Sequence, residues 1–293
     1  MEKKNRRRMG DRKDGRRLRT LDPYNAMTPY IMKTRTDSSN YFTDSLDVAE
    51  AEKFLREKRH NGYPGMGMLH LFIAMYIRVV AQYPAVNRFV SGQRIYARNN
   101  IEFVMTIKKE LKTDSAETSV KASFDPCDTI FDVYDKLNKE IEKVRLEGEA
   151  TSTDDIAKIL MKFPRPLLKF AIYFLGFMDY FGLLPQSLID ASPFHGSIII
   201  TDLGSIGMPA IYHHLYNFGN LPVFMSLGAK RKALEPSAEG TLVEHKYIDY
   251  SIVADERICD GFYFSQVFRT MKRILSNPQI LGAPPETVVK DID

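Results

Sequence analysis

The chain has 293 residues and a formal net charge of +4 at pH 7, and hydrophobic residues make up 44% of it. A chain of this length can bury a substantial core, and the even spread of its apolar segments favours one large domain. Its two cysteines, Cys127 and Cys259, lie far apart without a Cys-x-x-Cys spacing. This spacing excludes a disulfide framework and does not suggest a structural metal site.

Two further features of the sequence concern location. No uninterrupted apolar run approaches the roughly 20 residues that a bilayer-spanning helix needs. The first residues, MEKKNRRR, lack the apolar centre of a secretory signal. We therefore expect a soluble protein of the reducing cytoplasm.

The positive charge is concentrated at the N-terminus, where residues 1–20 hold ten Lys or Arg against three acidic residues. Residues 1–21 are interpreted as a basic arm or a hairpin, because Asp14-Gly15 is a turn sequence between stretches that can pair. A basic block of this kind can bind nucleic acid or another anionic surface. Without interleaved aromatic residues it is poor support for nucleic-acid recognition, so a solvated arm is favoured and a nucleic-acid partner is not expected.

The first half of the following domain alternates helix and strand patterns. An amphipathic helix is predicted over 47–59 with Asp47 as its N-cap, and a helix over 68–83 is apolar nearly all round, as in a helix buried between layers. Period-two patterns predict strands over 103–111 and 118–124. Asp128 is the predicted cap of a charged amphipathic helix that runs to Val144.

The segment 151–192 breaks this pattern and is interpreted as a helical insertion. It has an acidic, Ser/Thr-rich beginning and an apolar helix predicted over 167–181, which Gly182 and Pro185 end. The helix is too short to cross a membrane. One interpretation is a helix packed on the domain or at a subunit contact. The other is a hydrophobic lid that widens an acyl pocket or rests on lipid, making peripheral membrane contact through 167–181.

The remaining pattern predicts strands over 197–201, 222–229 and 242–253 and a closing amphipathic helix over 262–275. Helices and strands together predict an α/β layered fold with a mixed sheet. We take 22–285 as one domain and 286–293 as a tail.

Five ordered segments resemble one family. Residues 252–262, IVADERICDGF, resemble the acyltransferase signature His-x-x-x-Asp-Gly with Glu256 in the histidine position. Residues 197–207 and 222–228 resemble the family's Thr-Ile-Ser-Asn-Leu-Gly turn and its following strand. Residues 68–87 and 42–48 resemble its buried helix and first strand. The resemblance is to the chloramphenicol acetyltransferase-like superfamily, closest to the catalytic core of the dihydrolipoyl acyltransferase of 2-oxo acid dehydrogenase complexes.

The resemblance implies a two-layer α/β sandwich of the chloramphenicol acetyltransferase type that assembles as a homotrimer, with its active channel between subunits. It implies coenzyme A or acyl-CoA as a substrate and no metal. Thr201 corresponds to the hydroxyl that stabilises the oxyanion, and Glu256 occupies the position of the general base. Asp260 corresponds to an orienting carboxylate that forms a salt bridge with an arginine, for which Arg35 is the match.

Glutamate is a weaker base than histidine towards a thiol, so the substitution indicates impaired or altered catalysis. The adjacent His213 and His214 are a second candidate for the missing base. Two functions follow from these residues. One is an acyltransferase that moves an acyl group from acyl-CoA or an acyl thioester to a thiol, hydroxyl or amine. The alternative is a catalytically silent relative that acts as a binding or assembly partner.

Overall fold

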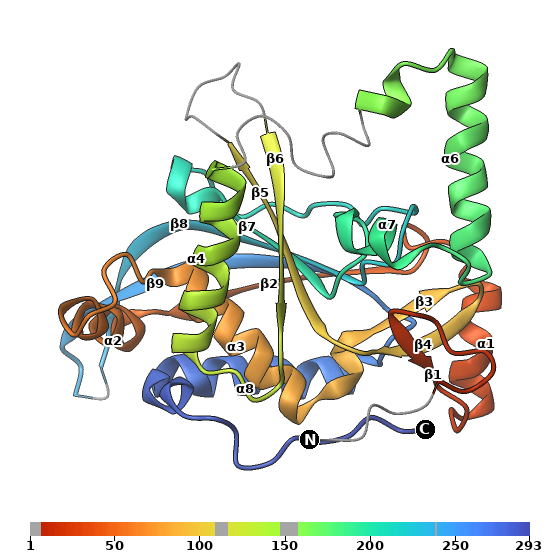
Figure 1. Ribbon diagram of the computed structural model, residues 1–293. Helices are drawn as coiled ribbons and strands as arrows, with labels where there is room; N and C mark the ends of the chain where they lie inside the picture. Colours follow the sequence, from red (N-terminus) through yellow and green to blue (C-terminus); the bar gives the residue numbers. More distant parts are fainter. Residues whose placement is uncertain (1–6, 109–116, 147–157, 238) are drawn as a thin grey trace.

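A mixed six-stranded sheet runs through the molecule and carries helices on one face (Figure 1). The structure is a computed structural model that describes residues 7–108, 117–146, 158–237 and 239–293. Along the sheet the strands are β2 (Ser39–Asp47), β9 (Leu242–Asp255), β8 (Val223–Pro236), β7 (Ile198–Asp202), β5 (Ile101–Lys108) and β6 (Glu117–Phe124). β7 is parallel to both of its neighbours, β5 and β8, whereas the other pairs are antiparallel.

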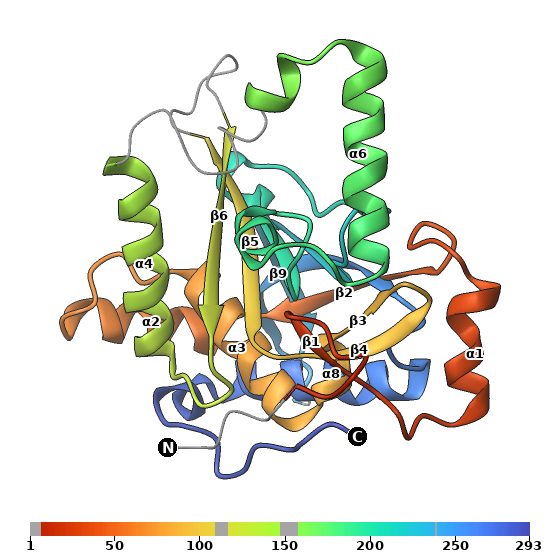
Figure 2. The same cartoon turned by 45° about the vertical axis from the view of Figure 1, so that its right-hand side comes forward.

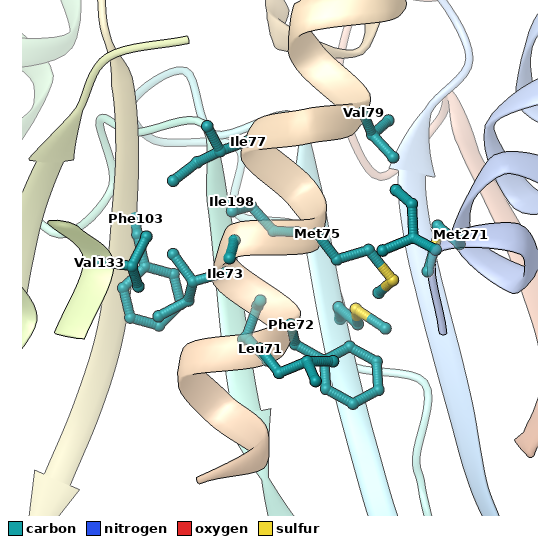
Figure 3. Close-up of a cluster of buried hydrophobic side chains, with 14 of the residues drawn as sticks. Leu71, Phe72, Ile73, Met75, Ile77, Val79, Phe103, Val133, Ile198 and Met271 are labelled. Atoms are coloured by element: carbon teal, nitrogen blue, oxygen red, sulfur yellow. The ribbon is translucent and has the colours of Figure 1, made fainter. Parts of the chain in front are cut away.

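One face of the sheet packs against helices α2 (Ala49–His60), α3 (Met68–Gln82), α4 (Ile130–Leu146) and α8 (Gly261–Ser276). α3 contacts both α4 and α8, so it is covered on nearly all sides. Its apolar side chains meet Phe103, Val133, Ile198 and Met271 from four different elements (Figure 3). This position explains why the sequence of α3 has no polar face.

The opposite face, called the outer face here, is covered partly by residues 203–221. A small apolar cluster joins the two: Val104, Ile199, Leu215, Leu221, Phe224 and Val253. Neighbouring residues of β8 therefore serve different sides, with Met225 in the helix-side core and Phe224 under the covering segment. This is the period-two alternation of a strand with both faces covered.

The basic N-terminal block belongs to a second, three-stranded sheet. β1 (Gly15–Arg17) pairs with β4 (Arg94–Arg98), which pairs with β3 (Arg88–Ser91), and α1 (Pro23–Ile31) follows β1. The hairpin expected within residues 1–21 is wrong, because β1 takes β4 as its partner. Gly15 is needed there, since a Cβ atom would lie 2.6 Å from the Phe89 ring.

In the described part of the block, arginines pair with carboxylates of the same chain, so the interpretation as a solvated arm is wrong for these residues; residues 1–6 lie outside the described residues. Arg8 and Arg16 form ion pairs with Asp293 at 2.7 and 3.1 Å. The backbone amides of Arg19 and Thr20 donate to the carbonyl of Asp293. The two ends of the described chain thus lie side by side.

The insertion projects from the body of the molecule. α6 (Arg165–Tyr180) stands upright beside the sheet in both views, preceded by helical residues 158–161 and followed by α7 (Gln186–Ala191) (Figures 1 and 2). Asp179 is the only buried residue of α6. The interpretation that this helix packs on its own domain is therefore wrong. The acidic beginning of the insertion, up to residue 157, lies outside the described residues.

Most predicted elements are present with ends that differ by a few residues, and two predicted caps are wrong. The helix α2 has Val48 and not Asp47 at its N-cap position, although Asp47 accepts from the Ala49 amide at 2.9 Å. The helix expected to start at Asp128 is capped by Thr129, whose hydroxyl accepts from the Asp132 amide at 3.3 Å while Asp132 accepts from the Thr129 amide at 2.8 Å. This reciprocal arrangement is a capping box with Asp in the third position. Asp128 instead accepts from the Asp125 amide in the preceding turn.

Candidate functional site

Glu256 lies on a tight turn directly after β9, and its side chain is exposed. Its backbone amide donates to the Ser38 carbonyl at 2.8 Å, which ties the turn to the start of β2. The residues on both sides of Glu256 are buried. The turn is thus fixed while the carboxylate itself points away from the core.

A buried ion pair fixes this turn. Asp255 is completely buried and accepts from Arg257 Nε at 2.8 Å and Nη2 at 2.6 Å. Ser38 Oγ donates to the same carboxylate at 3.0 Å, and Arg257 Nη1 donates to the Met32 carbonyl at 2.8 Å. The bidentate pair and these two further hydrogen bonds provide partners for the buried charges of both Asp255 and Arg257. Sequence reasoning missed Asp255, since one acidic residue at a strand end carries no distinctive signal.

The salt bridge expected between Arg35 and Asp260 is wrong. Arg35 is buried and donates to the backbone carbonyls of Tyr216 and Asn217 at 2.6 and 2.8 Å, and to those of Val90 and Gly219. Burial lowers the pKa of Arg35 to about 10, although the nearby Asp255 charge opposes that shift.

Asp260 is exposed and caps α8, where it accepts from the Tyr263 amide at 2.8 Å. A carboxylate at a helix N-terminus is stabilised there without an arginine. The carboxylate that orients the Glu256 turn is therefore Asp255, and its arginine is Arg257.

Thr201 is half-buried near the end of β7 and belongs to a row of hydroxyl groups across the sheet. The register places Thr201 opposite Ser226, Ser226 opposite Ser251, and Ser251 opposite Thr43. Residues opposite one another in neighbouring strands share a face. Ser226 bonds to the backbone of Ile211 in the covering segment, so this hydroxyl row lies on the outer face.

The turn after Thr201 depends on close backbone packing. A Cβ atom on Gly204 would lie 2.5 Å from the Gly228 carbonyl oxygen in β8. Asp202 accepts from the Ser205 amide at 3.2 Å and so closes the short helical turn Leu203–Ile206. Gly204 is therefore explained by contact with β8, and Gly207, with φ of +74°, by a left-handed helix end.

A single chain does not bring Glu256 and Thr201 together. Thr201 is aligned with Ser251 of β9 through Ser226, and Glu256 follows Ser251 by five residues. At about 3.4 Å per residue the two sites are roughly 17 Å apart along the strands, besides the spacing between strands. Neither of the two principal cavities, of about 40 and 190 Å³, is lined by either residue.

The histidine pair lies on the outer face. The His213 ring stacks on Phe224 of β8 with ring centroids 4.0 Å apart, and the His214 ring lies 4.7 Å from that of His213. Phe224 is two residues before Ser226 on the same face of β8, so the His213 ring that stacks on Phe224 lies roughly 7 Å along the strand from the hydroxyl row. His213 is therefore closer to Thr201 along the sheet than Glu256 of the same chain is.

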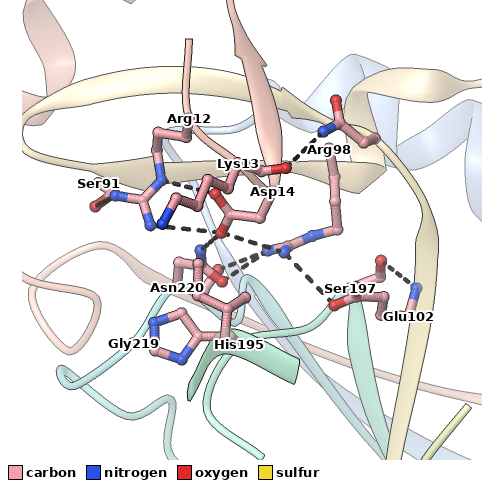
Figure 4. Close-up of polar contacts among 12 residues, drawn as sticks. Arg12, Lys13, Asp14, Ser91, Arg98, Glu102, His195, Ser197, Gly219 and Asn220 are labelled. Carbon is pink, nitrogen blue, oxygen red and sulfur yellow. Dashed lines mark hydrogen bonds and ion pairs between the residues drawn. The ribbon is translucent and has the colours of Figure 1, made fainter. Parts of the chain in front are cut away.

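A cluster of buried charges links four distant parts of the sequence at the base of α6, and Figure 4 shows Arg12, Asp14, Arg98 and His195 of this cluster. We call it the buried ion cluster, and its members are Arg12, Asp14, Arg98, Asp179 and His195. Arg12 pairs with Asp14 at 2.9 Å and with Asp179 at 2.6 Å, and His195 Nε2 lies 3.3 Å from Asp179. No pattern in the sequence indicates this cluster, because its members are far apart along the chain.

The charged groups of the buried ion cluster lie beside groups of opposite charge. Burial opposes ionisation of Asp179, but the neighbouring His195 ring and the charge of Arg12 outweigh burial and lower the pKa of Asp179 to about 2. Arg98 donates to the Asn220 side chain at 2.8 Å, and Asn220 donates to Asp14 at 2.7 Å. We assign the cluster a structural role, since it joins the N-terminal segment, β4, the end of α6 and the start of β7.

A solvent-accessible cavity of about 190 Å³ lies beside the cluster, lined by Lys33, Arg35, Arg257 and Asp179 among others. Arg35 and Arg257 use their guanidinium groups on backbone carbonyls and Asp255, as described above. Among the described residues, no group of three or more His, Cys, Asp or Glu is arranged to hold a metal ion. The candidate catalytic groups are thus the exposed Glu256, the hydroxyl row and the two histidines.

Comparison with known proteins places this arrangement in a known fold. No protein-family model matches the chain, and no curated protein matches it in sequence. A probable dihydrolipoamide acetyltransferase from Listeria monocytogenes 4b F2365 superposes with a TM-score of 0.55 at 11% identity, covering 88% of this chain and 93% of that one. The Azotobacter vinelandii dihydrolipoamide acetyltransferase gives 0.55 at 12%, covering 88% of each chain.

A chloramphenicol acetyltransferase gives a TM-score of 0.52 at 12% identity, covering 88% of this chain and 99% of that one. The chain therefore has the chloramphenicol acetyltransferase fold, which the dihydrolipoamide acetyltransferase cores share. The predicted α/β sandwich with a mixed sheet is confirmed, and the resemblance read from the sequence holds at the level of the fold.

Proposed function

We propose that this chain is an acyltransferase whose site forms between two copies, with Glu256 from one copy facing Thr201 of the next. The donor is acyl-CoA or another acyl thioester, and the acceptor is a thiol, hydroxyl or amine. The observation that carries the proposal is the separation of Glu256 and Thr201 within one chain. Glu256 is presented on a fixed turn, and a second chain is needed to bring a hydroxyl to it.

A homotrimer is the proposed assembly, and the outer face offers an apolar contact surface. Large apolar side chains are exposed beside the hydroxyl row on β2 and the covering segment: Tyr41, Ile206, Met208, Ile211 and Tyr212. The rings of Tyr41 and Tyr212 touch edge to face with centroids 5.5 Å apart. Aromatic residues of this kind are enriched at protein interfaces.

The proposed step is a direct acyl transfer. Glu256 takes the proton of the acceptor as its thiol, hydroxyl or amine attacks the thioester carbonyl, and the Thr201 hydroxyl donates to the oxyanion. The carbon–sulfur bond then breaks, and the proton passes from Glu256 to the leaving thiolate. A carboxylate is a weaker base than imidazole for this purpose, so we propose impaired or altered catalysis.

One observation favours the alternative of a catalytically silent binding or assembly partner. The Arg35–Asp260 pair that the resemblance implied is missing, and Arg35 instead holds the backbone of residues 216–219. The framework around the motif is thus rebuilt around Asp255 and Arg257. A chain with this different ion pair can keep the fold and the subunit contact while lacking acyltransferase activity.

The test combines a coenzyme A binding measurement with an acetyl-CoA consumption assay on the wild type, Glu256→Gln and Glu256→His. General-base catalysis contributes about 10²- to 10⁴-fold, so Glu256→His is expected to raise the rate, because it supplies a base suited to neutral pH. Glu256→Gln is expected to abolish wild-type turnover. His213→Ala and His214→Ala serve as controls and should leave that turnover in place if Glu256 is the base.

The outcomes separate the two functions. Binding with turnover that depends on Glu256 supports the acyltransferase, whereas turnover lost in His213→Ala assigns the base to the histidine pair. Binding without turnover in both wild type and Glu256→His supports the silent relative. A stable monomer in sedimentation at micromolar concentration contradicts the shared site itself.

A further inference from the structure

The exposed part of the insertion forms a surface that is separate from Glu256. We call residues 158–174 the distal segment; it comprises the helical residues 158–161 and most of α6. Its exposed large apolar side chains are Ile159, Met161, Phe163, Leu167, Phe170, Ile172, Tyr173 and Phe174. Tyr173 is 72% and Phe170 61% exposed. A contiguous group of exposed large apolar side chains marks an interaction site on a soluble protein.

The segment is held out from the body by its far end. At the base of α6, Asp179 binds Arg12 and His195, and Tyr180 Oη donates to Gln93 at 2.8 Å. With about 1.5 Å of rise per residue, the sixteen residues of α6 place its first turn roughly 24 Å from its last. Figures 1 and 2 show this first turn as an outermost point of the molecule.

The charges of the distal segment are all of one sign. Lys158, Lys162, Arg165 and Lys169 are exposed, and the segment contains no Asp or Glu. A contact between two copies of this same segment would set the four cations against one another with no acid to meet them. An anionic lipid surface complements both properties, since headgroups attract the cations and the interface accepts the aromatic and aliphatic side chains.

We propose that the distal segment docks the protein on an anionic lipid membrane, as a peripheral and not a spanning contact. In the described part of the chain, no helix combines the length and the apolar character needed to traverse a bilayer. Lys and Arg side chains lie at the headgroups and the rings of Phe170, Tyr173 and Phe174 enter the interface. The buried ion cluster fixes the direction in which the segment projects.

The first experiment measures binding of the full chain to vesicles of phosphatidylcholine alone and of phosphatidylcholine with phosphatidylglycerol. Binding is expected only to the anionic vesicles. Replacing Lys158, Lys162, Arg165 and Lys169 by Gln should weaken vesicle binding roughly 10²- to 10³-fold. Each cation near an anionic surface strengthens binding roughly three- to sixfold, and the four factors multiply. The matched control removes four exposed cations elsewhere: Arg56, Lys139, Arg269 and Lys290, each to Gln.

The second experiment separates apolar insertion from charge attraction. Phe170→Ser, Tyr173→Ser and Phe174→Ser in one variant should abolish measurable binding, whereas Leu234→Ser, Leu242→Ser and Val243→Ser, on another exposed surface, should retain it. The chain contains no tryptophan, so Phe170→Trp gives a single tryptophan as the fluorescent probe. Its emission should shift to the blue with anionic vesicles, and that of Leu234→Trp should not.

Unchanged circular dichroism and melting temperature verify that the exposed substitutions leave the fold intact. The proposal is overturned if the wild type binds neither kind of vesicle, or if both charge variants lose binding equally. It is also overturned if the serine variant of the distal segment changes the association state of the protein while vesicle binding is absent. That result assigns the segment to a contact with another copy.

Discussion

The two faces of the six-stranded sheet use the same strands for different purposes. On the helix side, Met225 and Leu227 join an apolar core in which α3 is enclosed. On the outer face, the intervening Phe224 and Ser226 meet a covering segment, a row of hydroxyls and two histidines. The first face stabilises the chain by burial alone, whereas the second leaves polar groups and exposed rings available for a ligand or a partner. Successive residues of a strand point to opposite faces, so one residue packs in the core while the next lies on the face that carries the candidate catalytic groups.

The largest expected effect tests the helix face. Phe72 is fully buried on α3, so Phe72→Ala should lower the free energy of unfolding by about 3–5 kcal/mol through lost burial and the cavity left behind. Urea denaturation measures this change. Phe262→Ala, at a residue that is 75% exposed, is the control and should have little effect. A loss below about 1 kcal/mol at Phe72 contradicts the enclosed position of α3.

Next in size is the buried ion cluster at the edge of the outer face. Asp179→Asn leaves Arg12 and His195 without their shared carboxylate, and removing one partner of a buried pair costs about 3 kcal/mol. The pKa of Asp179 is lowered from 3.8 to about 2 on folding. Its contribution is therefore complete above the unfolded value and disappears as the pH falls through the folded value.

Acid titration of stability checks this sign. Between pH 4 and pH 2 the wild type should lose roughly 2 kcal/mol from Asp179, and Asp179→Asn should lack that part of the loss. Asp37→Asn, at an exposed residue, should keep the wild-type profile. Equal acid profiles for wild type and Asp179→Asn contradict the assignment, as does a wild type that gains stability in this range.

A smaller effect is expected where the covering segment is attached. Ser226 Oγ accepts from the Ile211 amide at 2.9 Å and donates to the Ile211 carbonyl at 2.5 Å. Ser226→Ala should cost about 1–2 kcal/mol and speed hydrogen exchange at the Ile211 amide. Thr43→Val in the same hydroxyl row loses a bond to the Tyr250 carbonyl and should not change exchange at Ile211. Similar exchange in both variants argues against the attachment.

The smallest effect on stability should accompany a large effect on assembly. Tyr41 and Tyr212 are exposed in the single chain, so replacing both by Ser should change its free energy of unfolding by about 0.5 kcal/mol or less. If the outer face is the subunit contact, the same variant should weaken association at least about tenfold in sedimentation. Leu234→Ser with Leu242→Ser is the matched control and should assemble normally. Unaltered assembly of the tyrosine variant places the contact elsewhere.

Local patterns in the sequence were sufficient for most elements of the main domain, although the helices α1 and α7 were not predicted. The period of the apolar residues predicted α3, α8, β7 and β9, because each pattern is produced by a face that must be buried. The small sheet of β1, β3 and β4 was missed, since its strands are three to five residues long and rich in arginine. Short polar strands are defined by their partners, and those partners are distant in sequence.

In the candidate site, too, some residues were predicted from the sequence and others were missed. The motif 252–262 and the segment 197–207 identified Glu256 and Thr201 as the residues to examine, and the order of segments indicated the fold, which the structure confirms. The orienting pair was assigned to Arg35 and Asp260, whereas the structure has Asp255 with Arg257. A carboxylate at a strand end and one at a helix start look alike in a sequence. Their burial, which decides which one needs an arginine, depends on the whole fold.

The layers, the buried helix, the apolar character of the insertion and the identity of the candidate catalytic groups could all be predicted from the amino-acid sequence. These properties depend on the order of residues within one element. Three features became evident only in the folded chain: α6 projects from the body, arginines of residues 8–19 are paired within the molecule, and Glu256 and Thr201 are separated in one chain. The reason is physical: these depend on contacts among residues as far apart as Arg12, Asp179 and His195, whose burial changes their charge interactions.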